Sequence, residues 1–546
     1  MELAARSVET ERRESPLEMS PEQFRAVGHR LVERIADLLG SLSTRPVTPG
    51  ESPKVLRELL GNGSLPESGA PADYLLDETA SLLIEHSLFN GHPRFMGYIT
   101  SPPAPIGVLG ELLAAAVNPN CGAWILAPVA TEIEAQAVKW IAELIGYPSD
   151  CGGLLVSGGN MANFVGFLAA RRAKAKWDIG AAGVAGAVDV ASGPSEKGRP
   201  TSLSGLSGLS GAARRLRVYV SNETHTWIHK ATDLFGLGTE SIRWIPVDDR
   251  MRIATALLRR QIREDVESGD VPFLIVGNAG SVSTGAIDPL PELAAIAHEN
   301  GLWLHADGAY GAVAAVLPDA SADLRGLAEA DSVAVDPHKW LYAPLEAGCA
   351  LVRDRKALRD AFSYGAPYYH FEGDGSEVFN YFEYGMQNSR GFRALKVWLA
   401  LRHAGREGYA RMIADDIRMA EALHAFASDE PELQVFPRGL SITTFRYVPR
   451  DLRPAIAPNV APGFSPAGSP NNVESYLNQL NTQLVNRLQA SGEAFLSNAV
   501  IGGAFVLRAC IVNFRTSRED VRAVTQIVVR MGRELDAALR PAKLKM

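Results

Sequence analysis

Short apolar segments alternate with helix-length stretches between residues 150 and 340, and this alternation limits the chain to few folds. The segments are rich in β-branched and aromatic residues, as strands are, and they cover residues 152–156, 216–220, 243–247, 272–278, 302–306 and 331–335. The stretches between them include 253–266 and 290–299, where apolar residues recur at helical spacing. We therefore predict an α/β fold with a mostly parallel central sheet that helices cover on both faces.

A polar residue lies at or soon after the end of several predicted strands. These residues are Asn160, His225, Asn278, Asp307 and Lys339. Ligands of such folds bind beyond the carboxyl ends of the strands, so we expect the five side chains to share one site. Five such residues together are stronger evidence for a ligand site than any one of them alone.

Asp307 and Lys339, at neighbouring strand ends, indicate the cofactor. An aspartate that faces a pyridinium nitrogen and a lysine that forms a Schiff base are what pyridoxal 5'-phosphate (PLP) requires. A buried strand followed by an exposed lysine is the simpler interpretation of His338-Lys339 alone. The aspartate upstream favours the PLP site.

The segment 152–163 has the pattern of a strand, a glycine turn and a helix start. Such a turn can present backbone N–H groups and the positive end of a helix to a phosphate. Its spacing fits neither a Walker A loop nor the GxGxxG dinucleotide motif. The segment therefore suits a phosphate-bearing ligand without favouring a nucleotide.

The composition argues against several other classes of protein. A net charge of −8 leaves no basic excess to neutralise nucleic-acid phosphates. The most apolar stretch, 107–117, contains Glu111 and is too short to span a bilayer, and the N-terminus lacks the apolar core of a signal peptide. Four cysteines without a CxxC pair suit reduced thiols better than disulfides or a zinc site: Cys121, Cys151, Cys349 and Cys510. We expect a cytoplasmic protein with no metal, no membrane and no nucleic-acid partner.

Three regions are expected along the chain. Residues 1–104 form a helical segment, with Ser20 as a helix cap, that lacks a core of its own and packs on a partner subunit. Residues 105–409 form the large domain, interrupted at 178–212 by a flexible insertion rich in Gly, Ala and Ser. Residues 410–546 alternate helix and strand and form a smaller α+β domain.

Five motifs match one family in order along the chain: His92-Pro93-Arg94-Phe95, Ala127-Pro128-Val129-Ala130-Thr131-Glu132, His225, Asp307-Gly308-Ala309-Tyr310 and Asp336-Pro337-His338-Lys339-Trp340. Over roughly residues 20–540 the chain resembles the group II PLP-dependent amino-acid decarboxylases. This resemblance implies the PLP-dependent transferase fold type I, the aspartate-aminotransferase-like fold. It also implies a homodimer with active sites at the subunit interface, which would explain N-terminal helices without a core beneath them.

The resemblance assigns roles to the residues around the cofactor. Lys339 is the Schiff-base lysine, and the carboxylate of Asp307 keeps the pyridine nitrogen protonated. His225 stacks on the ring and Ala309 packs against its other side. The residues that lie at the phosphate are Gly159, Asn160 and His338.

Two residues depart from the family pattern near this site. Asn278 stands where the aromatic branch has threonine, close to the substrate carboxylate and the ring oxygen, and it can still form hydrogen bonds. Asp336 replaces the asparagine that the aromatic and glutamate branches both carry before Pro-His-Lys. It adds a negative charge near the phosphate unless it faces elsewhere, and the sequence offers no account of the change.

Tyr381 distinguishes simple decarboxylation from a related reaction. Counting back from Arg390-Gly391-Phe392-Arg393 places it on the family's lid tyrosine, which donates a proton to Cα after CO₂ leaves. Related aldehyde synthases carry phenylalanine there and admit oxygen. Tyr384 is a rival for this role, an ordinary aromatic residue is the alternative to both, and the loop 363–375 ahead of them is a candidate lid.

The substrate is the least defined part of the prediction. Tyr98 and Trp124 match pocket positions of the aromatic branch, whereas Asn120 and Gly122 stand where that branch carries apolar and aromatic residues. His92-Pro93-Arg94-Phe95 looks more like the glutamate branch. We expect decarboxylation of an aromatic or bulky L-amino acid. The alternatives are an acidic amino acid, an aldehyde synthase on the same fold, and a PLP-binding protein without catalysis.

Overall fold

The computed structural model describes residues 15–184, 215–364, 378–456 and 472–544. Most of the expected insertion at 178–212 and most of the candidate lid at 363–375 lie outside these ranges.

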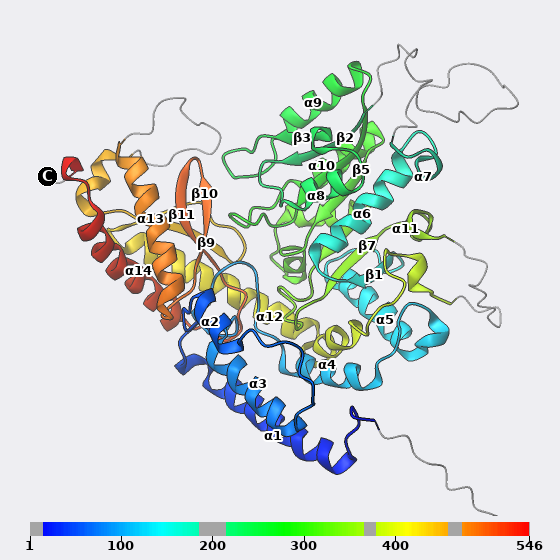
Figure 1. Ribbon diagram of the computed structural model, residues 1–546. Coiled ribbons are helices and arrows are strands. Elements are labelled where there is room, and N and C mark those ends of the chain that lie inside the picture. Colours follow the sequence, from blue (N-terminus) through cyan, green and yellow to red (C-terminus); the bar gives the residue numbers. More distant parts are fainter. Residues whose placement is uncertain (1–14, 185–214, 365–377, 457–471, 545–546) are drawn as a thin grey trace, which may run out of the picture.

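The central sheet lies in the large domain (Figure 1), and within the described chain its strand order is β1-β7-β6-β5-β4-β2-β3. The strands are β1 Gly152–Val156, β2 Leu216–Ser221, β3 Ile242–Ile245, β4 Val271–Asn278, β5 Trp303–Asp307, β6 Ser332–Val335 and β7 Gly348–Val352. β3, β2, β4, β5 and β6 are mutually parallel, whereas β7 runs antiparallel to β1 and β6. The predicted mostly parallel sheet is therefore confirmed. β7 was not among the predicted strands, and its five residues are all buried.

Helices cover both faces of this sheet (Figure 1): α5 Pro128–Leu144, α6 Gly159–Lys174, α8 Trp227–Leu234, α9 Thr255–Glu267, α10 Leu290–Asn300 and α11 Arg355–Phe362. α4 Pro105–Val117 instead packs against the start of α12 Ala394–Asp429, where its Gly110 lies against Lys396 and Leu399. Alternate strand residues point to opposite faces. Tyr219 and Ile275 belong to a buried cluster with α5, α9 and α10, whereas Val218 and Leu274 belong to another with α6, α8 and α11. Both faces are dry, which explains the apolar runs in the sequence.

The N-terminal helices are α1 Pro21–Ser41, α2 Pro53–Leu60 and α3 Ala72–His86. Ser20 caps α1 in a capping box with Gln23, as predicted. α1 and α3 lie side by side (Figure 1), where Arg34 donates to the backbone oxygen of Asp77 at 3.0 Å and to Ser81. None of the described side chains of α1 or α2 is fully buried. The helices therefore lack a core of their own.

The C-terminal region contains a second sheet, antiparallel throughout its described strands, in the order β10-β11-β9-β8. Its elements are β8 Leu433–Val435, β9 Ile442–Tyr447, α13 Asn472–Ser491, β10 Ser497–Ile501, β11 Ala504–Cys510 and α14 Arg518–Leu539. The long α12, Ala394–Asp429, joins this region to the large domain and is interrupted at Gly405, where φ is 66°. The expected boundary at 409/410 falls inside this helix.

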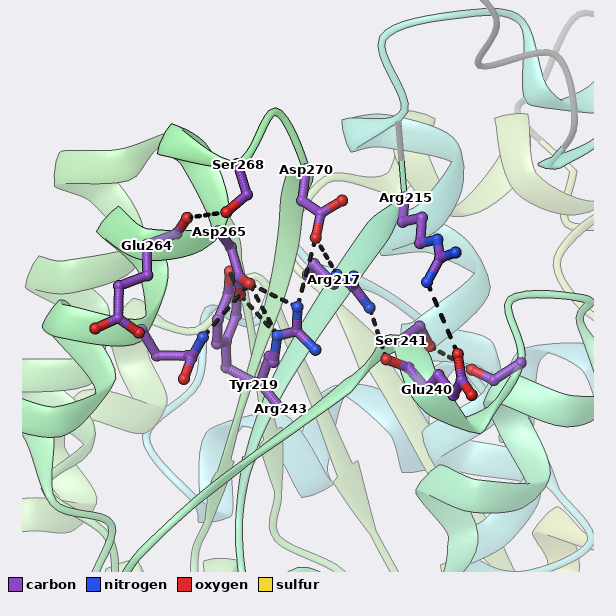
Figure 2. A network of polar contacts seen from close by, with 12 residues as sticks. Arg215, Arg217, Tyr219, Glu240, Ser241, Arg243, Glu264, Asp265, Ser268 and Asp270 are labelled. Carbon is purple, nitrogen blue, oxygen red and sulfur yellow. Dashed lines mark hydrogen bonds and ion pairs between the residues drawn. The ribbon is translucent and has the colours of Figure 1, made fainter. Parts of the chain in front are cut away.

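A network of ion pairs and hydrogen bonds lies at the amino-terminal ends of β2, β3 and β4 (Figure 2). This is the end of the sheet opposite to the carboxyl ends of its parallel strands. Asp265 of α9 accepts hydrogen bonds from the Tyr219 hydroxyl at 2.8 Å and from Arg243 of β3 at 2.7 and 2.9 Å. Arg217, near the start of β2, pairs with Asp270 at 2.6 Å. These contacts connect β2 and β3 to α9 and to Asp270, the residue just before β4.

No helix in the described ranges is both long enough and apolar enough to cross a membrane.

Candidate active site

A cavity of about 320 Å³ opens at the carboxyl ends of the parallel strands. Among the residues that line it are seven that the sequence predicted to bind the cofactor: Gly159, Asn160, His225, Asn278, Asp307, Ala309 and Lys339. The strand register explains part of the convergence, because Asn278 pairs with Asp307 across β4 and β5, and Asp307 pairs with Ala334 across β5 and β6. Lys339 follows β6 by one turn, closed by a hydrogen bond from its amide to the carbonyl of Asp336 at 2.9 Å.

Asp307 stands at the end of β5 with both carboxylate oxygens engaged. Its Oδ2 accepts the indole N–H of Trp227 at 2.8 Å, and its Oδ1 accepts the amide of Ala309 at 3.2 Å. Trp227 is fully buried in the first turn of α8. A carboxylate held on two sides keeps a fixed direction toward the cavity.

His225 precedes α8 and faces the cavity. Its Nδ1 accepts the backbone N–H of Trp227 at 3.2 Å, which leaves the proton of the neutral ring on Nε2. Burial lowers the pKa of His225, and the negative charge of Asp307 opposes this only in part. The ring is therefore neutral at physiological pH and suited to lie against an aromatic cofactor.

Lys339 forms an ion pair with Asp336 inside the cavity, with Nζ 2.9 Å from Oδ2. The Asp336 side chain is 1% exposed and that of Lys339 21%, so solvent screens the pair only weakly. Burial alone would lower the pKa of Lys339, but the carboxylate of Asp336 and, farther away, that of Asp307 raise it above its ordinary value. Lys339 is therefore protonated, and its ammonium group is held in place by Asp336.

Hydrogen bonds to Asp288 and Ser221 hold the side-chain amide of Asn278 in place. Its Nδ2 donates to Asp288 at 2.9 Å and to Ser221 at 3.0 Å, and its backbone N–H also donates to Asp288 at 2.7 Å. Asp288 is buried, and burial raises its pKa to about 6. Because both amide hydrogens are used, the side-chain oxygen of Asn278 remains to accept a hydrogen bond in the cavity.

The phosphate end of the predicted site consists of the turn from β1 into α6. Gly158 has φ of 87°, a conformation that favours glycine, and α6 begins at Gly159. His338 packs on this turn: a Cβ at Gly158 would lie 3.4 Å from the His338 ring, and its Nδ1 lies 2.7 Å from the carbonyl oxygen of Ala347. A helix start with two glycines at its first residues leaves room for a phosphate against backbone N–H groups.

Taken together, the cavity fits PLP. It offers an amine, a carboxylate, an imidazole and a glycine-bounded helix start within one cavity, and these are the groups that bind PLP in enzymes.

The predicted substrate-binding residues do not line this cavity within one chain. Tyr98 is 61% exposed with φ of 54°, although the next residue, Ile99, lines the cavity. Asn120 uses its side-chain oxygen to accept the amides of Gly122 at 3.1 Å and Arg390 at 3.2 Å. Trp124 donates its indole N–H to Glu132 at 2.9 Å. One chain therefore does not bring these side chains to Lys339.

Tyr381 and Tyr384 also lie away from Lys339, in the wall of a second cavity of about 600 Å³ that Trp124 shares. Tyr381 is buried, and burial raises its pKa far above the ordinary value. The guanidinium of Arg390 lies 4.6 Å from the centre of its ring. Within one chain, Tyr381 is therefore among the residues that line this second cavity and not the cavity of Lys339.

Arg390 is the anchor of that region. It forms a fully buried ion pair with Glu134 of α5 and donates to the carbonyl oxygens of Leu155 at 2.6 Å and Cys121 at 3.0 Å. Glu134 in turn accepts the amide of Leu155 at 2.8 Å. This pair connects α5 and β1 to the segments that carry Trp124 and Tyr381.

A comparison with protein families matches residues 53–182 and 208–448 to the pyridoxal-dependent decarboxylase conserved domain. The chain belongs to this family. It is 31% identical over 526 residues to an aromatic-L-amino-acid decarboxylase of Bacillus atrophaeus, covering 95% of this chain and 97% of that protein. It is 27% identical to a phenylacetaldehyde synthase of a Rosa hybrid cultivar, covering 93% of this chain and 94% of that protein.

Solved structures agree with this family assignment. The crystal structure of Oryza sativa TDC with PLP and tryptamine aligns with a TM-score of 0.80 at 26% identity, over 96% of this chain and 100% of that one. Mouse CSAD aligns with a TM-score of 0.80 at 25% identity, over 94% and 99%. The expected fold type I and the expected PLP cofactor are confirmed, and the protein is a PLP-dependent enzyme of the decarboxylase family.

The sequence did not reveal three side chains of this decarboxylase site. Trp227 donates a hydrogen bond to Asp307, and Asp288 accepts one from Asn278. A tryptophan in a helix, or an aspartate before a proline, gives no sign of such a contact in the sequence. Glu223 lines the cavity with an Oε2 that has no hydrogen-bond partner among the described residues, and burial raises its pKa. Only its position two residues before His225 could have drawn attention to it.

Proposed function

We propose that this protein uses PLP to remove the carboxylate of an aromatic or bulky L-amino acid, releasing CO₂ and placing a proton at Cα to give the amine. The observation that carries the proposal is the convergence of Lys339, Asp307 and His225 on one cavity in a chain of the decarboxylase family. When bound, PLP supplies an electron-accepting ring for the pair of electrons that the departing CO₂ leaves behind.

The residues around the cavity would each take one task. Lys339 would bond to the cofactor aldehyde, and Asp307, held by Trp227, would keep a proton on the ring nitrogen. His225 and Ala309 would enclose the ring from its two sides. The remaining contacts, at the phosphate, would come from Gly159, Asn160 and His338.

Asn278 would accept a hydrogen bond from the ring hydroxyl through its side-chain oxygen. The support is its Asp288 and Ser221 partners, which consume both amide hydrogens. A threonine could rotate its hydroxyl to donate or accept, whereas Asn278 is restricted to accepting.

We also propose a homodimer in which each subunit completes the other's site. The surface that supports it is apolar and exposed on α4 and the segment after it, at Leu109, Leu112, Leu113, Val117, Ile125, Leu126 and Val129. Patches of this kind on a folded chain mark interfaces. The helices α1 and α2, with no fully buried side chain in the described chain, would add to the contact.

In this dimer, Trp124, Asn120 and Tyr381 would serve the partner's cavity. They share one region around the Glu134–Arg390 pair, away from Lys339 of their own chain. Tyr381 would give the proton to Cα and Tyr384 is its rival. Tyr98 would enter the substrate pocket beside Ile99.

A cytoplasmic location completes the proposal. Its support is the four cysteines, all of them buried and unpaired in the described chain, which suits a reducing compartment.

Product analysis with purified protein tests the reaction. The protein is incubated with PLP and separately with tryptophan, tyrosine, phenylalanine, glutamate and aspartate, and CO₂, amine, aldehyde and peroxide are measured. We expect amine and CO₂ from an aromatic substrate and neither from Lys339→Ala. Turnover of only the acidic substrates would replace the substrate proposal, and aldehyde with peroxide would identify an aldehyde synthase.

Mixing two inactive variants tests the shared site. Lys339→Ala and Trp124→Ala each lose activity, but a mixed dimer contains one site in which both residues are native. Recovery of activity after mixing is the expected result. If mixing restores nothing while sedimentation shows that mixed dimers form, Trp124 does not act across the interface.

A further inference from the structure

Asp336 is the residue near the cofactor site for which the sequence offers no account. Its carboxylate lies 2.9 Å from Nζ of Lys339 and 3.8 Å from Nε2 of His338. Its other oxygen, Oδ1, has no hydrogen-bond partner among the described residues. The ion pair with Lys339 is therefore the main contact of a carboxylate that is almost completely buried.

The first residue of α6, Gly159, leaves the space that this carboxylate occupies. A Cβ at Gly159 would lie 2.5 Å from Oδ2 of Asp336, a distance that real Cβ atoms do not reach. The backbone of Asp336 is held as well, because its amide donates to the carbonyl of Ala309 at 3.2 Å. Asp336 thus lies between the positive end of α6 and the ammonium group of Lys339, and both stabilise its negative charge.

The other titratable groups around Nζ do not replace Asp336. They are Asp307 from β5, His225 before α8, His338 beside the lysine and Cys510 from β11, and Cys349 from β7 acts on Asp336 itself. Burial lowers the pKa of both histidines and raises the pKa of both thiols, so all four are uncharged near neutral pH. Asp307 is the other carboxylate that acts on Nζ, and its two oxygens are taken by Trp227 and Ala309.

We propose that Asp336 is a positioning residue for Lys339, whose carboxylate holds the side-chain nitrogen in place and keeps a positive charge on it before and after the nitrogen bonds to PLP. The inference rests on the proposed function, which assigns Lys339 to the cofactor. The asparagine of the related branches could hold the nitrogen by a hydrogen bond but has no charge to offer it.

A spectroscopic titration of the PLP-loaded enzyme tests this role. The visible absorbance of lysine-bound PLP changes when the linking nitrogen loses its proton, so its pH midpoint reports the charge on that nitrogen. Wild type, Asp336→Asn and Asp336→Glu are titrated in parallel. We expect the midpoint of Asp336→Asn to fall by about one to two pH units, the usual effect of removing an opposite charge within 4–6 Å. Asp336→Glu, which retains a carboxylate, should titrate closer to wild type.

A purely structural role predicts a different result. Asp336→Asn would then lower the melting temperature and leave the midpoint where it is in wild type, which would overturn the inference. If wild type shows no visible band with PLP, or Lys339→Ala retains the band, the proposed function itself has failed, and the two failures are distinguishable.

A second measurement covers the case in which Asp336→Asn does not load PLP. The cofactor-free proteins are treated with trinitrobenzenesulfonate, which attacks uncharged amines, and labelling of Lys339 is followed by mass spectrometry across a pH series. Lys339 should become reactive at a lower pH in Asp336→Asn than in wild type. Identical pH profiles in the two proteins would also overturn the inference.

Discussion

The indole N–H of Trp227 donates a 2.8 Å hydrogen bond to Oδ2 of Asp307, which joins the first turn of α8 to the end of β5. The same tryptophan gives its backbone N–H to Nδ1 of His225. One residue thereby orients both the carboxylate and the imidazole of the proposed PLP site. Because indole only donates, the contact requires an ionised or accepting Asp307 oxygen.

Trp227→Phe should weaken PLP binding by about 10- to 100-fold, since a hydrogen bond to a charged group contributes roughly 1.5–3 kcal/mol. The backbone contact to His225 survives this change, so the loss reports the indole alone. The dissociation constant of PLP, measured by its absorbance, provides the test. Trp303→Phe is the matched control, because Trp303 is also buried in the same cluster and donates to Ser332. It should lower stability and leave PLP affinity unchanged. Wild-type affinity in Trp227→Phe would contradict the role.

Gly159→Ala should reduce PLP affinity more strongly than a surface glycine substitution does. The new Cβ would meet Oδ2 of Asp336 at 2.5 Å, so the carboxylate must move and the start of α6 must shift with it. Gly63→Ala is the control, because a Cβ there has nothing within 4 Å. Equilibrium dialysis of PLP against both variants decides the matter, and equal affinities would mean that the turn adapts without cost.

The sequence predicted residues that line the cofactor cavity but not the side chains that hold them in place, and the difference has a physical reason. Asn278, Asp307 and Lys339 follow strands of one parallel sheet, and local patterning is enough to place strand ends at one edge. The contacts behind them span long separations, as between Trp227 and Asp307 or between Asn278 and Ser221. No local pattern encodes such pairs.

The position of Tyr381 shows the same limit in another form. Counting from the Arg390 motif locates the residue in the chain, but not in space. Its place depends on the Glu134–Arg390 pair, whose members lie 256 residues apart. Its role also depends on a partner subunit. For this reason Tyr381 stays a prediction, whereas the shared cavity of Asp307 and Lys339 is observed in one chain.

Asp416 should make the protein less stable as the pH rises. This buried carboxyl of α12 accepts hydrogen bonds from Trp340 at 2.8 Å, Tyr342 at 2.5 Å and the amide of Asn513 at 3.3 Å, and burial raises its pKa to about 7. Below about pH 4 the carboxyl is protonated in the folded and unfolded states alike. Between about pH 4 and 7 the unfolded chain loses the proton first, so stability falls by about 1.4 kcal/mol per pH unit, roughly 4 kcal/mol in all, and then levels off.

Urea unfolding across this pH range measures the effect of Asp416. The difference in unfolding free energy between wild type and Asp416→Asn should change between pH 4 and 7 and be constant above. Asp415→Asn is the control, since this neighbour on the same helix is 57% exposed. A flat difference for Asp416→Asn would mean that its carboxyl titrates as in the unfolded chain.

Glu134→Gln should lower the unfolding free energy by about 3–5 kcal/mol, because it leaves the guanidinium of Arg390 buried without a counter-charge. Urea denaturation measures the loss. Asp265→Asn, in the network at the other end of the sheet, should cost less, because Arg243 is partly exposed and keeps Asp270 as a partner, and it should not affect the segments of Trp124 and Tyr381. Amine production by the two variants is then measured without urea, at a temperature where both remain folded. Only Glu134→Gln should lose it.

The double variant Glu134→Leu with Arg390→Met separates the effect of the ion pair on stability from its effect on the placement of Trp124 and Tyr381. Replacing a buried ion pair by apolar side chains commonly costs little, so most of the lost stability should return. The hydrogen bonds from Arg390 to Cys121 and Leu155 do not return, nor does the guanidinium against the Tyr381 ring. Amine production should therefore stay low in a stable protein. If activity recovers together with stability, the ion pair contributes only to folding. It would then no longer support the proposed placement of Trp124 and Tyr381 at the partner's site.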